Sequence, residues 1–181
     1  MEVYTTEEQQ VEVIKSWWKE NGTSVLAGTV IGLVGLFGWR YYNELQQTNQ
    51  EAASQAYNAM TAQLAKGDDA ALEQAKSFIS AHQGDAYAEL AALQLAAAAV
   101  KAGKLDLAAE QLTQVAANGD ESIKPIAALR LARVLKDQGK ADEALAQLGK
   151  INNDAFKAQV AEVRGDVLLG QGKPEEARDA Y

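Results

Sequence analysis

The chain lacks, or nearly lacks, several residues on which common chemistries depend. Its 181 residues include no cysteine and a single histidine, His82. Disulfides, thiolate catalysis and cysteine-based zinc sites are therefore excluded, and a histidine-dependent triad or multi-histidine metal site is disfavoured. Only two prolines occur, which together with frequent alanine indicates an all-α protein. The formal net charge of −8 disfavours nucleic-acid binding, which needs a basic surface.

No pattern in the sequence predicts catalysis. The paired acids at 68–69 and 175–176 stand at expected helix starts, where the helix dipole stabilises negative charge. Lys76 and Ser77 are neighbours in an expected helix, so their side chains point apart. Phosphate-binding loops, EF-hands and zinc-protease motifs are absent from the sequence. We therefore predict a protein that is not an enzyme and that uses no cofactor, metal or catalytic residue.

An uncharged segment, residues 21–39, is the most informative feature that is present. A helix of about 20 residues crosses the apolar core of a bilayer. Aromatic residues flank the segment at both ends, as they do at membrane interfaces. The sequence therefore predicts a transmembrane helix over residues 21–42 that contacts membrane lipid. The flanking aromatic residues are Trp17, Trp18, Trp39, Tyr41 and Tyr42.

Two other interpretations of this segment are weaker. A cleaved signal peptide would need a small-x-small cleavage site after the apolar run, but residues 37–42 are bulky. A buried core helix would rarely be apolar all round and bordered by aromatics. Lys15 and Lys19 precede the segment and Arg40 follows it, a bias that places the N-terminus in the cytoplasm. The rest of a single-pass protein then lies outside the cytoplasm.

Residues 1–20 are predicted to form a cytoplasmic amphipathic leader. Thr5 and Glu8 have the spacing of a capping box at a helix start. Val11, Ile14 and Trp18 then recur on one helical face. Such a helix would run along the membrane surface into the span.

Small residues recur on one face of the predicted span. Gly28 and Gly32 form a GxxxG pattern, which Ser24 and Gly35 extend. Small residues at this spacing allow a partner helix to approach closely. The alternative is that glycine is simply common in membrane helices. We predict a transmembrane helix contact through these four residues.

Beyond a connecting helix at 43–66, the sequence becomes periodic. Gly67, Gly103, Gly139 and Gly172 are spaced by 36, 36 and 33 residues. The last three glycines are each followed by lysine and, five residues on, by alanine. Repeats of this length built from helix pairs form solenoids. Residues 67–181 are therefore predicted to form a repeat domain of paired helices, with the last repeat incomplete.

The repeats resemble tetratricopeptide repeats over roughly residues 60–181. A small residue stands seven residues before each of the last three glycines, and another stands eleven residues before it. A larger residue stands nine residues after each of these glycines. This pattern suits close packing of the two helices of a pair. The aromatic residue expected early in the first helix is replaced by alanine, so the units are degenerate. These positions are Ala96, Ala132 and Gly165; Ala92, Ala128 and Ala161; and Leu112, Leu148 and Tyr181.

The first helix of each unit would supply a protein-binding groove in such an arrangement. The predicted groove is apolar in one unit, basic in the next and acidic in the last. Some of its leucines have an alternative role as core residues. The face lacks the lysine and asparagine set that clamps a peptide carboxylate. The predicted groove residues are Leu90, Leu93, Ala97, Leu129, Arg133, Lys136, Glu162 and Asp166.

The N-terminal run gives a more specific resemblance. The segments 4–12, 14–15 and 17–22 read YTTEEQQVE, IK and WWKENG, and together with the anchor and repeats they resemble the YfgM family over the whole chain. This resemblance implies an accessory subunit of the bacterial Sec translocon, in the inner membrane, with its repeats in the periplasm. It also implies the SecYEG channel, the periplasmic chaperone PpiD, unfolded secreted proteins and a cytoplasmic stress-response regulator as partners.

Two functions remain from the sequence. The first is a non-enzymatic translocon accessory whose repeats hold a chaperone or an emerging chain and which restrains the regulator. The second is a scaffold for envelope assembly or division, unrelated to secretion, with the same anchor and repeats. Proteins captured by the repeat face would distinguish them.

Overall fold

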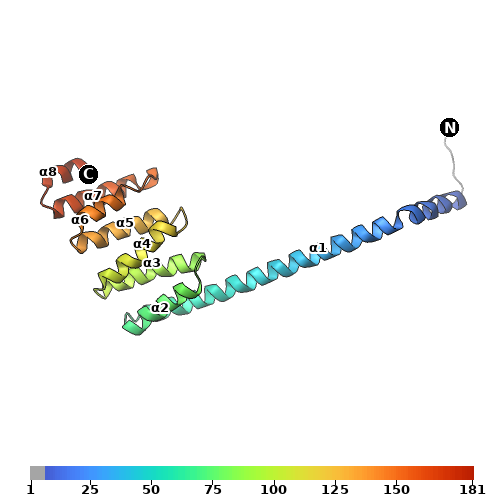
Figure 1. The fold of residues 1–181 in the computed structure, drawn as a ribbon, viewed down its shortest axis with the longest axis horizontal. Helices are drawn as coiled ribbons and strands as arrows, with labels where there is room; N and C mark the ends of the chain where they lie inside the picture. The colour runs from blue at the N-terminus through green and yellow to red at the C-terminus, as the bar shows by residue number, and fades with distance from the viewer. Residues whose placement is uncertain (1–6) are drawn as a thin grey trace. The chain divides into compact units, whose positions relative to one another are not determined.

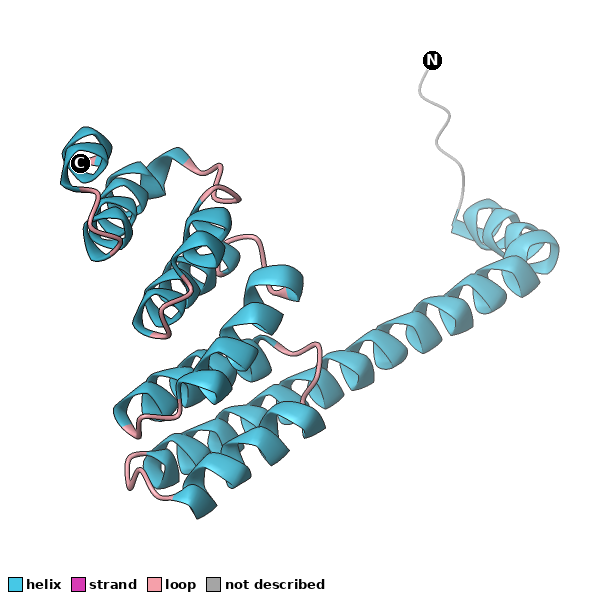
Figure 2. Ribbon diagram, turned by 60° about the vertical axis from the view of Figure 1, so that its left-hand side comes forward, coloured by secondary structure: helices cyan, strands magenta, loops and turns pink. Residues whose placement is uncertain are grey.

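The computed structural model describes residues 7–181, and the side chains from Gln10 onward (Figure 1). Within these residues every regular element is helical, which confirms the predicted all-α class (Figure 2). The elements are α1 (Glu7–Leu64), α2 (Asp69–Ala81), α3 (Ala86–Lys101), α4 (Leu105–Asn118), α5 (Lys124–Asp137), α6 (Ala141–Leu148), the 3-10 helix η1 (Asp154–Phe156), α7 (Lys157–Gly170) and α8 (Pro174–Ala180).

The chain divides into two compact units, residues 1–51 and 52–181. The first unit consists of the greater part of α1. It contains the only stretch in the described part of the chain that is long and apolar enough to cross a membrane, with a mean hydropathy of 1.6 over 18 residues. Only 6% of that stretch is buried, so it is not the core helix of a globular domain.

Helix α1 has no break at either end of the predicted span. Helical backbone continues through residues 20–21 and 42–43. The borders of leader, span and connecting helix therefore rest on hydropathy and charge, and remain predictions. The predicted capping box at Thr5 lies outside the described residues. The predicted leader face is exposed at Val11, Ile14 and Trp18.

The second unit is a series of helix pairs. The end of α1 pairs with α2, and the pairs α3–α4, α5–α6 and α7–α8 follow (Figure 1). Each pair also contacts the next, because α2 packs on α3, α4 on α5, and α6 on α7. This is the nearest-neighbour packing of a solenoid, as the sequence period predicts.

Glycine ends the first helix of every pair. Gly67, Gly103, Gly139 and Gly172 have φ between +71° and +75°, a left-handed conformation that costs non-glycine residues free energy. In the last three units the next residue closes a Schellman motif; for example, the Lys140 amide donates to the Leu135 carbonyl at 2.8 Å. The turn predicted from the glycine spacing is confirmed.

Small residues at the predicted positions let the helices of each pair approach. Ala96 and Ala132 are buried, and Leu112 and Leu148 fill the space against them with 1% exposure each. In the last pair the fit is tighter, because a Cβ at Gly165 would lie 2.5 Å from the Tyr181 ring. Close packing therefore explains the small residues.

Two clusters form the core. The larger joins α3 to α7, and the smaller joins the end of α1 to α2 and α3 through residues such as Met60, Leu72 and Leu95. Tyr57 of α1 adds aromatic contacts with Phe78, at 6.4 Å between ring centroids, and with Tyr87, at 5.5 Å. The last part of α1 is therefore a structural member of the repeats.

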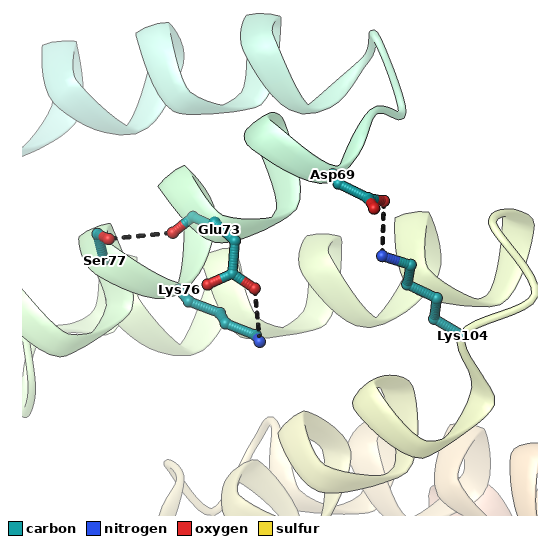
Figure 3. A network of polar contacts seen from close by, with 5 residues as sticks. All are labelled: Asp69, Glu73, Lys76, Ser77 and Lys104. Carbon is teal, nitrogen blue, oxygen red and sulfur yellow. Dashed lines mark hydrogen bonds and ion pairs between the residues drawn. The ribbon is translucent and has the colours of Figure 1, made fainter.

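Polar bonds along the turns connect successive pairs. In each, a side chain next to the turn glycine donates to an aspartate in the first turn of the preceding second helix. We call these bonds the inter-unit clasps; Figure 3 shows the first of them. They are Lys104 Nζ to Asp69 Oδ1 at 2.6 Å, Gln138 Nε2 to Asp106 Oδ1 at 2.8 Å, and Gln171 Nε2 to Asp142 Oδ1 at 3.0 Å.

Candidate protein-binding surface

The first helices α3, α5 and α7 each present a row of accessible side chains. Along each helix these side chains recur every three or four residues, so they share one side. We call this set the first-helix face. It comprises Leu90, Gln94, Ala97 and Lys101 of α3, Arg130 and Arg133 of α5, and Glu162 and Asp166 of α7, of which Asp166 is half-buried and the others are exposed.

Two of the predicted groove residues belong to the core instead. Leu93 is 7% exposed and Leu129 is 5% exposed, and both lie in the larger core cluster. Both stand ten residues before a turn glycine, where the next unit covers the helix. Glu162 has the same position in α7, where no further unit follows in the structure, and it is exposed. The alternative that the sequence left open for the leucines is therefore the one that applies.

The other predicted residues lie at the surface. Leu90 is 39% exposed, and Ala97 and Arg133 are exposed. Lys136 is half-buried, with Nζ 4.0 Å from Asp137 Oδ1. Asp166 accepts a hydrogen bond from the Tyr181 hydroxyl at 2.8 Å. This bond raises the pKa of Tyr181 above its ordinary value, because it favours the protonated phenol.

Three residues of the face, Gln94, Lys101 and Arg130, are not among the predicted groove residues. Gln94 and Arg130 stand four residues after Leu90 and Ile126, on the side that the structure leaves uncovered. Gln94 could have been found from the sequence, because residues four apart on a helix share one side and Gln94 stands four residues after Leu90. The burial of the leucines at 93 and 129, which shifts the accessible side by one residue, would have indicated Arg130.

A hollow lies on this face beside α3. It has a volume of about 340 Å³ and opens between the end of α1 and α3. Ala97 and Gln94 line it on one side, and Thr61 and Ala65 on the other. Because Ala97 is small, the surface is recessed here, and an apolar side chain of a bound segment would fit.

The predicted contact residues of the span are all accessible. Ser24, Gly28, Gly32 and Gly35 are exposed along one side of α1. No atom lies within 4 Å of a Cβ built at any of the three glycines. The face is therefore open to another helix, and the contact itself stays a prediction.

The residues that could have suggested chemistry have structural roles. Lys76 donates to the Glu73 carboxylate at 2.8 Å, and Ser77 donates to the Glu73 backbone carbonyl (Figure 3). The first bond raises the pKa of Lys76, which opposes use as a base. His82 caps α2 and stacks on Phe78 at 4.4 Å. Among the described residues, no cluster of acids and histidine could hold a metal.

These features define a class: a helix-pair repeat domain that follows a helix able to span a membrane. A family model described as a tetratricopeptide repeat-like domain matches residues 15–181. This repeat-like domain, together with a relative named as an ancillary subunit, points to a non-enzymatic protein. No solved structure matches the chain.

Three relatives carry the same name, ancillary SecYEG translocon subunit. The protein of Escherichia coli strain K12 is 39% identical over 183 residues, covering 100% of this chain and 88% of that protein. Those of Haemophilus influenzae and Aggregatibacter actinomycetemcomitans are 31% and 34% identical over 176 residues, each covering 97% of this chain and 86% of the relative. The chain belongs to this family of ancillary SecYEG translocon subunits, the YfgM family.

Proposed function

We propose that this chain is a non-enzymatic, membrane-anchored accessory of the Sec translocon. The observation that carries the proposal is the 39% identity, over the entire chain, to a protein named for that association. The span of α1 holds the protein in the inner membrane, with its N-terminus in the cytoplasm and its repeats in the periplasm. The two lysines before the span and the single arginine close after it support this orientation.

In this proposal the two units bind different partners. The small-residue side of the span, Ser24 to Gly35, contacts a helix of the SecYEG channel or of the chaperone PpiD. The first-helix face holds PpiD or an emerging unfolded secreted protein near the channel exit. The N-terminal leader restrains a cytoplasmic stress-response regulator. Exposure of both surfaces supports these assignments.

Co-purification tests the contact of the span. The tagged full-length chain, extracted from its own membrane in mild detergent, is expected to recover SecY, SecE, SecG and PpiD. The double variant Gly28→Leu/Gly32→Leu is expected to lose part of this set, because leucine keeps two helices apart. Val30→Leu/Val34→Leu is the matched control, since both valines are exposed on the opposite side of the helix. Full recovery with the glycine variant would contradict the contact.

Site-specific photocrosslinking tests the role of the repeats. Ala97 and Arg133 are suitable positions because they are exposed, whereas Leu93 is buried. Glu110, exposed on α4, is the control position. Capture of translocon components, PpiD or secreted chains at the first two positions would support the proposal. Capture of cell-wall or division proteins alone would support an envelope scaffold instead.

A further inference from the structure

Arg130 and Arg133 form a pair of unneutralised charges at the centre of the first-helix face. Both are exposed on α5, and a separation of three residues makes them neighbours on the helix surface. No carboxylate among the described residues lies within ion-pair distance of either. Asp137, four residues after Arg133, lies beside Lys136 Nζ instead. Two adjacent cations without partners are unexpected in a protein of net charge −8.

Elsewhere in the repeats an acid commonly stands three residues before a base and pairs with it. At the corresponding positions before the two arginines stand Ala127 and Arg130 itself. Local neutralisation is therefore present at several surface cations and absent at this pair. Other cations without an ion pair among the described residues, such as Lys101 and Lys150, have no unpaired cation three or four residues away. The local pairs are Glu73–Lys76 at 2.8 Å, Glu121–Lys124 at 2.6 Å, Asp154–Lys157 at 2.9 Å and Glu175–Arg178 at 3.3 Å.

We infer that Arg130 and Arg133 recognise carboxylate side chains of an extended acidic segment in a protein partner. The inference rests on the proposed function, because it gives the chemistry of the segment that the repeats bind. Two guanidinium groups offer planar forks that hold carboxylates through paired hydrogen bonds. A partner supplies the neutralising charge that α5 lacks.

The neighbouring helices specify the rest of the segment. On one side, α3 offers the hollow at Ala97 and the exposed Leu90, which suit an apolar side chain. On the other side, α7 offers Glu162, which suits a lysine or arginine. Helices α5 and α7 are in contact, and packed helices lie about 8–10 Å apart, while an extended chain rises about 3.3 Å per residue. The segment therefore carries an acid and a base about three residues apart, with the apolar residue further away on the other side of the acid.

Fluorescence anisotropy with designed peptides tests this inference on the full chain in detergent. The probe is a labelled peptide with leucine, a glutamate pair and lysine at that spacing, used in both chain directions. A second peptide replaces the glutamates by glutamines, and a third by lysines. The glutamate peptide is expected to bind about tenfold or more tightly than the glutamine peptide, because charge-assisted bonds are lost.

Charge reversal gives the decisive comparison. Arg130→Glu/Arg133→Glu is expected to weaken glutamate-peptide binding by about tenfold or more and to create binding of the lysine peptide. Lys150→Glu/Arg164→Glu is the matched control, because it changes net charge equally at exposed residues off this face. Equal weakening by both variants, or no preference for glutamate, would overturn the inference. The inference would also be overturned if the chain bound vesicles of anionic lipid or single-stranded DNA in a way that depends on the two arginines, but did not bind the peptides.

The outcome is separable from that of the proposed function. The proposed function assigns co-purification with SecYEG to the span, and the charge reversal changes no residue of the span. Retained co-purification without acidic-peptide binding would refute the arginine assignment alone. If the glycine variant lost co-purification but still bound the peptide, the contact of the span would be confirmed separately and the arginine assignment would be unaffected.

Discussion

Replacing Leu129 by alanine distinguishes a core residue from a groove residue. Leu129 is 5% exposed within the larger core cluster, so truncation leaves a cavity between α5 and its neighbours. Buried leucine-to-alanine changes cost about 2–5 kcal/mol of the free energy of unfolding. Leu90→Ala is the matched control, because Leu90 is 39% exposed and belongs to neither core cluster. The control is expected to cost less than about 1 kcal/mol.

Urea unfolding of the full chain in detergent, followed by far-UV circular dichroism, measures both variants. The slope of unfolding free energy is about 1–3 kcal/mol per molar urea, so Leu129→Ala is expected to lower the midpoint by about 1–2 M. The Leu90→Ala midpoint is expected to fall by less than half of that. Equal midpoints for the two variants would refute the assignment of Leu129 to the core. Loss of partner binding by Leu129→Ala at an unchanged midpoint would refute it as well.

Three further predictions concern turns, clasps and one phenol. Gly139→Ala is expected to lower stability by about 1 kcal/mol because φ is +75°, whereas Gly170→Ala, at a helical and open position, is expected to be neutral or stabilising in the same urea assay. A double-mutant cycle of Asp106→Ala and Gln138→Ala is expected to give a coupling of about 0.5–1.5 kcal/mol, and additive costs would contradict the clasp. Tyr181 is expected to titrate above its ordinary pKa in an NMR titration, because a carboxylate accepts its hydrogen bond.

The sequence predicted the features that depend on local backbone chemistry. Turn glycines at fixed spacing predicted where the first helices end. Pro125 and Pro174 stand in the first turns of α5 and α8, where proline is tolerated. These predictions succeed because φ restrictions and helix starts act within a few residues.

Features that depend on neighbouring units could not be obtained in this way. Periodicity shows that Leu93 and Glu162 are equivalent, but not that the following unit covers Leu93 while Glu162 is exposed. The clasps join residues 29–35 positions apart, and no local pattern predicts which polar side chain will reach which aspartate. The arginine pair became apparent only when the ion pairs around it were known.

The clasps have a mechanical consequence for the repeat domain. They form a row of three bonds along the turns, one between each pair of helices and the next. At the other end of the helices the linking loops connect successive pairs covalently, and the Asp120 amide donates to Glu89 Oε2 at 3.0 Å, which ties the loop after α4 to its own pair. Successive pairs are therefore held at both edges, by the covalent chain at the loops and by the clasps at the turns. Without the clasps, successive pairs would be free to separate along the turns while the loops still connect them.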